Sequence, residues 1–449
     1  MFKKRIITMT VVISAMCIDN ISAQTEMTLH DCMKYAVENS TKMKMQRTET
    51  ADARAERTYA YTKAFTPSIN ANTYASFNFG RAVDPETNTY KNIQTFNNGY
   101  SINAQLTLFD GFAAINNINI ARTALKMGIS REQQIRDELC LQVMQAYYNV
   151  VYTSHMRDVC NEMVTTAADN VTLVRRQEEL GEKSHADVVH LEAELAARKY
   201  ELVEMTSLYD DALLKLKDLM LWNFDEEIFI DKSVAMTDQL LQNDYSTAML
   251  VDKALTTMPA VSIAKNKMDN ARRNKRVAFA SMLPTLSFVV GWNTSYYTYQ
   301  GVTTAPFSRQ FKDNSGEYVQ FNLSIPLFNS LSGHTRYVKA KNAQRRAAAE
   351  YEQTLHDVES EVIRALNERN QAKASYVQAE AMMHSQEEAY ILDKSKMHKG
   401  LISPVEFRTS SDAYIKSKAL RIDALLKYYL KRSVVEYYNG ISYIEQINH

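Results

Sequence analysis

The sequence predicts a mixed α/β membrane protein with an internal two-fold duplication, in which each chain supplies four strands to a shared barrel and long helices to a helical barrel. Three observations predict this fold. The 449 residues carry one long unit twice, 219 positions apart, as Gly181 and Gly400 illustrate. Each unit has two strands in which apolar and uncharged polar residues alternate. Each unit also has a helical stretch too long to bury its apolar stripe in one compact core.

The first residues have the pattern of a secretory signal peptide, which we place at 1–23. A basic start at 3–5 precedes a mostly apolar run at 6–18, and small residues occupy 22–23. The apolar run is shorter than a membrane-spanning helix, and a retained anchor is the alternative. Cys17 is a poor candidate for lipidation, because the residue before it is methionine, where a small residue is expected. We therefore expect the mature chain to be exported.

Composition excludes several classes of protein. Lysine plus arginine (52) balances aspartate plus glutamate (52), which argues against a nucleic-acid partner. Only 11 glycines and 7 prolines are present, which favours long regular elements. Three cysteines follow residue 23, and an odd number predicts no disulfide framework. We interpret Cys32, Cys140 and Cys160 as small apolar fillers.

The duplication divides the chain. Residues 106–109 match residues 325–328, and Gly181 and Ser184 match Gly400 and Ser403 at the same offset. We expect a first repeat at 24–220, an inter-repeat equatorial segment at 221–250, a second repeat at 251–439 and a C-terminal tail at 440–449.

Each repeat is expected to open with a helix, at 29–65 and 251–282, which ends before Pro67 or Pro284 because proline disfavours the helical conformation. Two strands then follow, at about 68–80 and 97–109 in the first repeat and at about 285–299 and 316–328 in the second. Loops at 81–96 and 301–316 should face outside.

The strands have one apolar face, and the other face carries Asn, Gln and Ser with almost no charge. This suits a transmembrane barrel with a wet lumen and a lipid-facing outside. Period two alone equally fits a soluble, half-buried sheet.

The long helices favour the barrel. Residues 112–180 contain no proline, and as one helix they would extend on the order of 100 Å. Such a helix needs partners along its whole length. Four strands cannot close a barrel, and an open strand edge cannot lie in lipid, so several copies must share one barrel.

These features together resemble the outer-membrane efflux protein family, the TolC-like channels. The resemblance covers nearly the whole mature chain, and it rests on the doubled unit, on Leu108-Phe109-Asp110-Gly111 running into a helix, and on the two Gly-x-x-Ser turns. It implies a homotrimer with a twelve-stranded barrel in the outer membrane of a Gram-negative bacterium and a long periplasmic α-barrel. It also implies docking with a periplasmic adaptor and an inner-membrane RND or ABC transporter, without catalysis or a cofactor.

The Gly-x-x-Ser turns, 181–184 and 400–403, predict helical hairpins. Glycine suits the left-handed residue that ends a helix. Ser184 with Asp187, and Ser403 with Glu406, have capping-box spacing for the next helix. The resemblance implies that the tips, through Gly181, Ser184, Gly400 and Ser403, contact the adaptor.

By the same resemblance, Asp187 and Glu406 line the closed aperture of the channel. The alternative is that both acids only cap their helices. Ile402 stands where the family's best-known member has an arginine that links hairpins, and Thr409 stands where it has a second ring acid, so the gate is expected to be held with fewer ionic links. His185 and His190 do not share a helix face, which argues against a metal site.

Two other functions stay open at this stage. A periplasmic adaptor also has an exported helical hairpin, but a single one, whereas this chain has two. A soluble coiled-coil protein would not need the alternating strands. The exported cargo leaves no signal in the sequence, because the pump and the adaptor select it.

Overall fold

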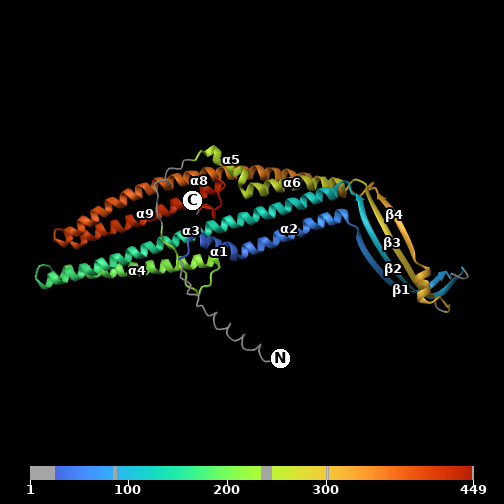
Figure 1. The fold of residues 1–449 in the computed structure, drawn as a ribbon, viewed down its shortest axis with the longest axis horizontal. Helices are drawn as coiled ribbons and strands as arrows, with labels where there is room; N and C mark the ends of the chain where they lie inside the picture. Colours follow the sequence, from blue (N-terminus) through green and yellow to red (C-terminus); the bar gives the residue numbers. More distant parts are fainter. Residues whose placement is uncertain (1–25, 84–87, 234–244, 300, 302, 447–449) are drawn as a thin grey trace, which may run out of the picture. The chain divides into compact units, whose positions relative to one another are not determined.

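The computed structural model describes residues 26–83, 88–233, 245–299, 301 and 303–446. The predicted signal peptide and Cys17 lie outside the described residues. The chain forms two compact units: the first comprises Met1–Ser40, Arg136–Thr247 and Ile363–His449, and the second comprises Thr41–Ile135 and Ala248–Val362. Helices α3 (Ala113–Glu179) and α8 (Ser332–His398) run through both units (Figure 1). Each unit thus combines segments from both predicted repeats.

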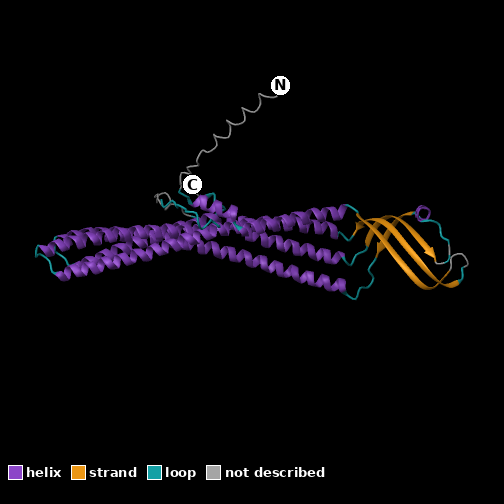
Figure 2. Cartoon of the chain, turned by 90° about the horizontal axis from the view of Figure 1, so that it is seen from below, coloured by secondary structure: helices purple, strands orange, loops and turns teal. Residues whose placement is uncertain are grey.

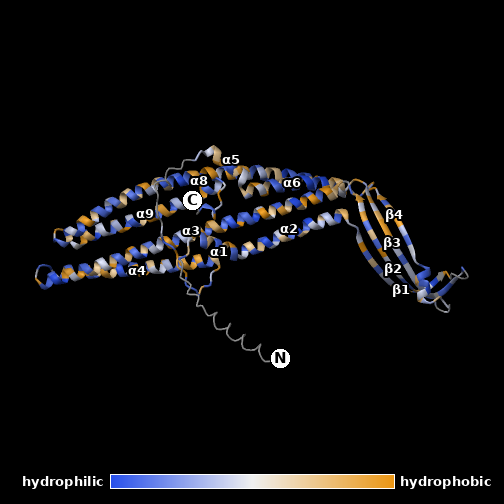
Figure 3. Ribbon diagram, in the orientation of Figure 1, coloured by the Kyte–Doolittle hydropathy of each residue, from blue (hydrophilic) through white to orange (hydrophobic). Residues whose placement is uncertain are grey.

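The second unit contains one antiparallel sheet in the order β1-β2-β3-β4 (Figure 2). Its strands are β1 (Ser68–Val83), β2 (Tyr90–Phe109), β3 (Thr285–Tyr299) and β4 (Gly316–Ser324). Ala71 lies opposite Ile102, and Ile102 lies opposite Trp292, so the apolar residues share one face. Figure 3 shows the alternation of polar and apolar residues along the strands. Pairing of β2 with β3 joins the two halves of the duplication.

Three strand ends differ from the expectation. Most of the expected loop at 81–96 is strand, because β1 and β2 stay paired as far as Val83 and Tyr90, past Gly80. Its residues 84–87 lie outside the described residues. Strand β4 ends at Ser324 and not at 328, since Pro326 has no N–H for a strand partner. The expected loop at 301–316 holds a short helix, α7 (Phe307–Asp313).

Both opening helices are interrupted, whereas the sequence pattern predicts two continuous helices. The first separates into α1 (Leu29–Asn39) and α2 (Thr41–Phe65), and Ser40 between them is extended, with ψ of 127°. Asn and Ser compete with the helix backbone for hydrogen bonds, and the Asn39 amide donates to Tyr35 O at 3.0 Å. The second separates into α5 (Thr247–Thr257) and α6 (Pro259–Ala280). Pro259 lacks the N–H of a helix interior and pushes Met258 out of the helical region.

In the second unit, α6 packs between the first part of α3 and the first part of α8. Arg273 of α6 donates to the Thr123 hydroxyl at 2.8 Å, and the rings of Phe279 and Tyr337 lie 6.0 Å apart. Gly128 of α3 packs closely against Thr50 of α2: a Cβ on the glycine would lie only 3.1 Å from the threonine hydroxyl oxygen. The helices therefore reach the sheet as a packed layer.

The first unit contains two helical hairpins, α3 with α4 (His185–Met220) and α8 with α9 (Pro404–Tyr438). Val171 and Val174 of α3 pack against Val188 and Leu191 of α4. In the second hairpin, α8 and α9 pack through an aromatic and methionine cluster that also includes Met163 of α3. Its members are Met163, Met383, Tyr390, Met397, Phe407 and Tyr414. No helix in the described residues has the length and apolar character needed to cross a bilayer.

The described part of the inter-repeat segment packs on α3. Met27 bridges Ile230, the Tyr147 hydroxyl donates to Asp231 O at 2.6 Å, and His155 Nε2 lies 3.2 Å from Lys232 O. Residues 234–244 lie outside the described residues. Cys32, Cys140 and Cys160 are free and buried, and burial raises the pKa of Cys32 and Cys140 to about 12.

Candidate functional site at the helical hairpins

The first hairpin turn begins where α3 ends. Gly181 has φ of +75°, its N–H donates to Glu178 O at 2.9 Å, and the N–H of Glu182 donates to Gln177 O at 2.8 Å. These two bonds form a Schellman motif, which satisfies the last carbonyls of the helix. The second turn repeats the motif: Gly400 has φ of +70° and donates to Met397 O at 2.9 Å. Both glycines therefore take the conformation that the sequence predicts.

Both following helices begin with a complete capping box. The Ser184 hydroxyl accepts from the Asp187 N–H at 3.3 Å, while Asp187 Oδ2 accepts from the Ser184 N–H at 3.1 Å. In the second hairpin, Ser403 Oγ accepts from the Glu406 N–H at 3.2 Å, and Glu406 Oε2 accepts from the Ser403 N–H at 2.9 Å. Each box satisfies two backbone donors that the helix leaves unpaired.

The capping bonds define the charge state of the first acid. Hydrogen bonds from the Ser184 hydroxyl and N–H hold the pKa of Asp187 below its usual value, so this carboxylate is anionic near neutral pH. Asp187 is partly exposed and Glu406 is exposed. Each acid thus caps its helix and still presents a carboxylate at a hairpin tip, and the capping function does not exclude an aperture function.

The two departures from the family pattern have distinct surroundings. Ile402 packs against the cluster that contains Tyr390, Phe407 and Tyr414, so it anchors the turn through apolar contact. The Thr409 hydroxyl donates to Val405 O at 3.3 Å within α9. His185 Nδ1 lies 2.9 Å from Glu178 Oε1, and in the described part of the chain no three His, Cys, Asp or Glu residues gather as a metal site would require.

A buried arginine, which no sequence pattern singled out, joins the two hairpins. Arg198 of α4 is 5% exposed and pairs with Asp412 of α9. Its guanidinium also donates to Glu201 at 3.0 Å and to Glu194 at 3.5 Å. Burial raises the pKa of Glu194. For Arg198, burial lowers the pKa, but the bonds to Asp412 and Glu201 outweigh it and the pKa is raised. The spacing of Glu194, Arg198 and Glu201 on one helix was the available signal.

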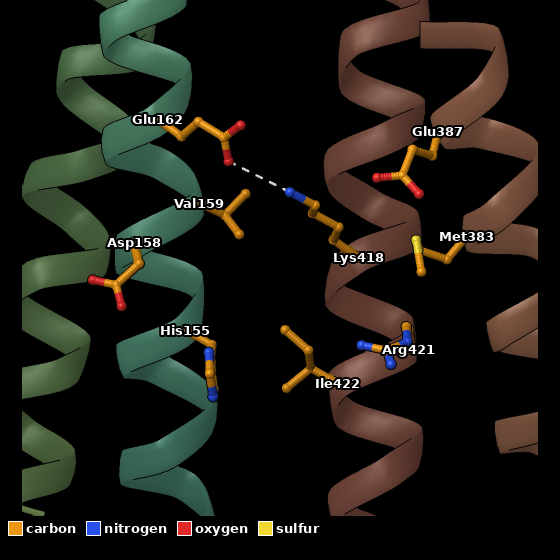
Figure 4. Close-up of a pocket in the computed structure, with 9 residues that line it drawn as sticks. All are labelled: His155, Asp158, Val159, Glu162, Met383, Glu387, Lys418, Arg421 and Ile422. Carbon is orange, nitrogen blue, oxygen red and sulfur yellow. Dashed lines mark hydrogen bonds and ion pairs between the residues drawn. The ribbon is translucent and has the colours of Figure 1, made fainter. Parts of the chain in front are cut away.

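A second ionic link lies between α3 and α9. Lys418 Nζ lies 3.4 Å from Glu162 Oε2 across a cleft of about 310 Å³ (Figure 4). Arg421 of the same cleft pairs with Glu380 of α8 at 2.6 Å. Both ion pairs therefore connect helices within one chain.

The sheet contributes a separate polar surface. Side chains of its polar face, together with residues of α2 and of the start of α3, line a concavity of about 760 Å³. Its polar and charged members include Glu56, Lys63, Gln105, Thr107, Asp110, Ser287 and Asn322. A concave polar face opposite an apolar face is what the wall of a membrane duct requires.

A half-barrel of strands joined to paired helical hairpins is the architecture of an outer-membrane channel. The family model "Outer membrane efflux protein" matches residues 33–220 and 250–431. The chain belongs to this family, and it is an outer-membrane efflux channel.

Solved structures support the same fold. The chain is similar to CusC, which is described as undergoing transmembrane channel formation (TM-score 0.76, 15% identity, covering 92% of this chain and 91% of that one). It is also similar to the outer membrane channel CmeC of Campylobacter jejuni (TM-score 0.74, 16% identity, 93% and 85% covered). The outer membrane protein VceC of Vibrio cholerae gives a TM-score of 0.74 at 13% identity, with 92% and 96% covered. A search of curated protein sequences finds no significant match.

Proposed function

We propose that the chain is one of three identical subunits of the exit duct in a tripartite export assembly. The trimer forms a twelve-stranded barrel in the outer membrane of a Gram-negative bacterium and continues into the periplasm as a helical barrel. There it docks with a periplasmic adaptor that connects it to an inner-membrane RND or ABC transporter. The duct is passive and catalyses no reaction; the transporter supplies the energy.

The open sheet is the observation that supports this proposal most directly. Within the described chain, β1 and β4 each have a strand partner on one side only. Unpaired N–H and C=O groups in a bilayer cost several kcal/mol each, so strand edges in lipid must be paired. Identical neighbours can pair β4 of one chain with β1 of the next, and the family supports closure by three copies.

The hairpin tips are the proposed periplasmic end. Gly181, Ser184, Gly400 and Ser403 shape the two turns that would contact the adaptor. In a trimer, Asp187 and Glu406 would each form a ring of three carboxylates at the aperture, and such a ring attracts cations.

The test begins with the assembly. The purified protein in detergent should migrate as a trimer before boiling and as a monomer after it, and it should conduct ions in planar bilayers. A soluble monomer without conductance would refute the duct.

The aperture function of Glu406 is tested with variants that separate its negative charge from its role in the capping box. Glutamine can replace glutamate in a capping box, so Glu406→Gln removes the charge and keeps the helix start, whereas Glu406→Ala removes both. We expect both variants to change the block of single-channel current by divalent cations. Glu182→Gln, in a turn but outside the capping boxes, is the control. A block that is unchanged in both Glu406 variants and in Asp187→Asn would refute the aperture role and leave the duct intact.

A further inference from the structure

The short helix α7 lies on the apolar face of the sheet. The ring of Phe311 lies 5.4 Å from Tyr100 and 5.8 Å from Trp292, and the ring of Phe307 lies 5.3 Å from Tyr296. Trp292 is opposite Ile102 in the register, so this is the face of the apolar alternation. The helix therefore covers the end of β2 and β3 that is remote from the long helices.

Side-chain amides fix α7 in this position. Strand β4 begins at Gly316, opposite Asn293, so it does not reach the last residues of β3. There Gln310, which is 5% exposed, accepts from the Tyr297 N–H at 3.1 Å and donates to Tyr297 O at 3.0 Å. Asn314 donates to Ser295 O at 2.8 Å. The two amides thus take the place of a strand partner along this edge.

A buried hydroxyl adds a contact from the sheet itself. Thr294, 2% exposed, donates to Phe311 O at 2.7 Å. The position of α7 is therefore held by polar bonds as well as by ring contacts.

The outward side of α7 is charged. Arg309 and Lys312 are exposed, and Arg309 lies 3.4 Å from Asp313. Phe307 beside them is 45% exposed. Farther along the same face, Val319 and Phe321 are 65% and 66% exposed, as lipid-facing side chains of a barrel would be in an isolated chain.

These observations restrict where α7 can lie in a membrane. It rests on the surface that faces lipid, but its outward charges are costly in hydrocarbon. An element with aromatic residues on one side and cations on the other is stable at the headgroup level, where rings anchor and cations meet phosphates.

We propose that α7 is a membrane-surface anchor whose Arg309 and Lys312 bind phosphate groups of lipid headgroups at the outer rim of the barrel. This inference rests on the proposed function, which places the apolar face of the sheet against lipid. The occupant is the lipid surface, and free phosphate ions and the aqueous exterior are the alternatives that the experiments separate.

The position of α7 is tested with a thiol-reactive fluorophore on Ser308→Cys in the full-length trimer in vesicles. The described native cysteines are buried, so labelling is selective. Phe321→Cys on the apolar face and Asn72→Cys on the polar face are the matched controls. We expect headgroup-attached nitroxides to quench the label at position 308 most, mid-chain nitroxides to quench the label at 321, and a water-soluble quencher alone to reach 72.

Two results would overturn the placement: a label at 308 that behaves like the label at 72, or one that behaves like the label at 321. If the label at 321 is not quenched by lipid nitroxides, the lipid-facing assignment fails, and with it the proposed function.

The phosphate contact is tested by charge removal. Phosphatidylglycerol in phosphatidylcholine vesicles should raise the temperature at which the wild-type trimer dissociates, and Arg309→Gln with Lys312→Gln should remove most of that shift. Lys396→Gln with Lys399→Gln, on exposed lysines at a hairpin tip, is the control and should keep it. An equal shift in the α7 variant, or the same shift with inorganic phosphate alone, would overturn the proposal.

Discussion

Arg198 of α4 and Asp412 of α9 form an ion pair that joins the two helical hairpins of one chain. The guanidinium is buried, with a side chain 6% exposed, whereas the Asp412 side chain is 48% exposed. The buried Arg198 charge therefore needs an ionic partner, whereas the charge of Asp412 is partly screened by solvent. In the proposed duct, whose aperture would lie at the hairpin tips, this link would resist separation of the two hairpins.

We expect Asp412→Asn to lower the free energy of unfolding by about 1 kcal/mol, because the half-exposed carboxylate is screened by water. We also expect a larger single-channel conductance, since the hairpins lose a link. Thermal unfolding and planar-bilayer recording measure the two effects. Arg408→Gln is the control, because Arg408 approaches the same carboxylate only at 3.8 Å. A conductance equal to that of the wild type would show that the pair is merely structural.

The turn glycines give a second prediction. Gly181 and Gly400 have φ of +75° and +70°, and a Cβ at either position would meet no atom within 4 Å. Alanine there would cost about 1 kcal/mol per site from backbone strain alone. We expect each variant to unfold at a lower temperature and Gly181→Asn to recover part of the loss, since asparagine tolerates the left-handed region.

Gly316→Ala is the matched control for the turn glycines. Gly316 is not one of the described glycines with a positive φ. A Cβ on it would lie 3.9 Å from the nearest atom. Equal losses at positions 181 and 316 would contradict the assignment of strain to the turns.

Local rules predicted the hairpin tips, because a helix end is determined by neighbours three to five residues away. Glycine at 181 and 400 and the Ser-x-x-acid spacing are visible in the sequence, and the structure has both Schellman motifs and both capping boxes. The break before Pro259 was also visible as a local signal, but the apolar periodicity on either side concealed it. The break at Ser40 had only a weak signal, since serine and asparagine occur within many helices.

Contacts between distant residues were not predictable in this way. Asp412 is 214 positions from Arg198, and no periodicity connects them. The position of α7 depends on the end of β4 at Gly316, which leaves an edge for Gln310 and Asn314 to fill. A segment with glycine, proline and polar residues is predicted as a loop unless that edge is known.

Asp137 gives a pH prediction within the first unit. It is 4% exposed, and its Oδ2 has no hydrogen-bond partner among the described residues. Burial raises the pKa of Asp137 from 3.8 to about 6. The hydrogen bond with Tyr437 and the charge of Arg136 lower the pKa, but their effect is smaller. The unfolded chain releases this proton near pH 4, while the folded chain keeps it until about pH 6.

The stability contributed by protonated Asp137 is therefore fully present below about pH 4 and is lost as the pH rises to about 6. The shift corresponds to about 3 kcal/mol. We expect Asp137→Asn to be stabilised relative to the wild type at about pH 7 but not at about pH 4, in urea unfolding at both values. A difference between the two proteins that does not vary with pH would contradict the raised pKa.

Two glycines of the sheet lie beneath tyrosine rings of neighbouring strands. Gly291 is opposite Tyr318, and a Cβ on Gly291 would lie 2.4 Å from that ring. The Tyr318 hydroxyl in turn donates to Asn103 at 3.2 Å, two strands away. Gly99 and Tyr74 repeat the arrangement between β1 and β2, where a Cβ would lie 2.3 Å from the ring. Each tyrosine ring thus packs directly on the backbone of a glycine on the polar face.

We expect Gly291→Ala to displace Tyr318 and break its bond to Asn103, at a cost of about 1–3 kcal/mol from overpacking. The measurement is the temperature to which a sample must be heated before electrophoresis for the proposed trimer to migrate as monomers. Tyr318→Phe is the companion variant: it keeps the ring over Gly291 and removes only the hydroxyl, so it should cost less. If Gly291→Ala matched Tyr318→Phe in its effect, the hydrogen bond alone would explain the loss, and the close approach of ring and backbone would contribute nothing.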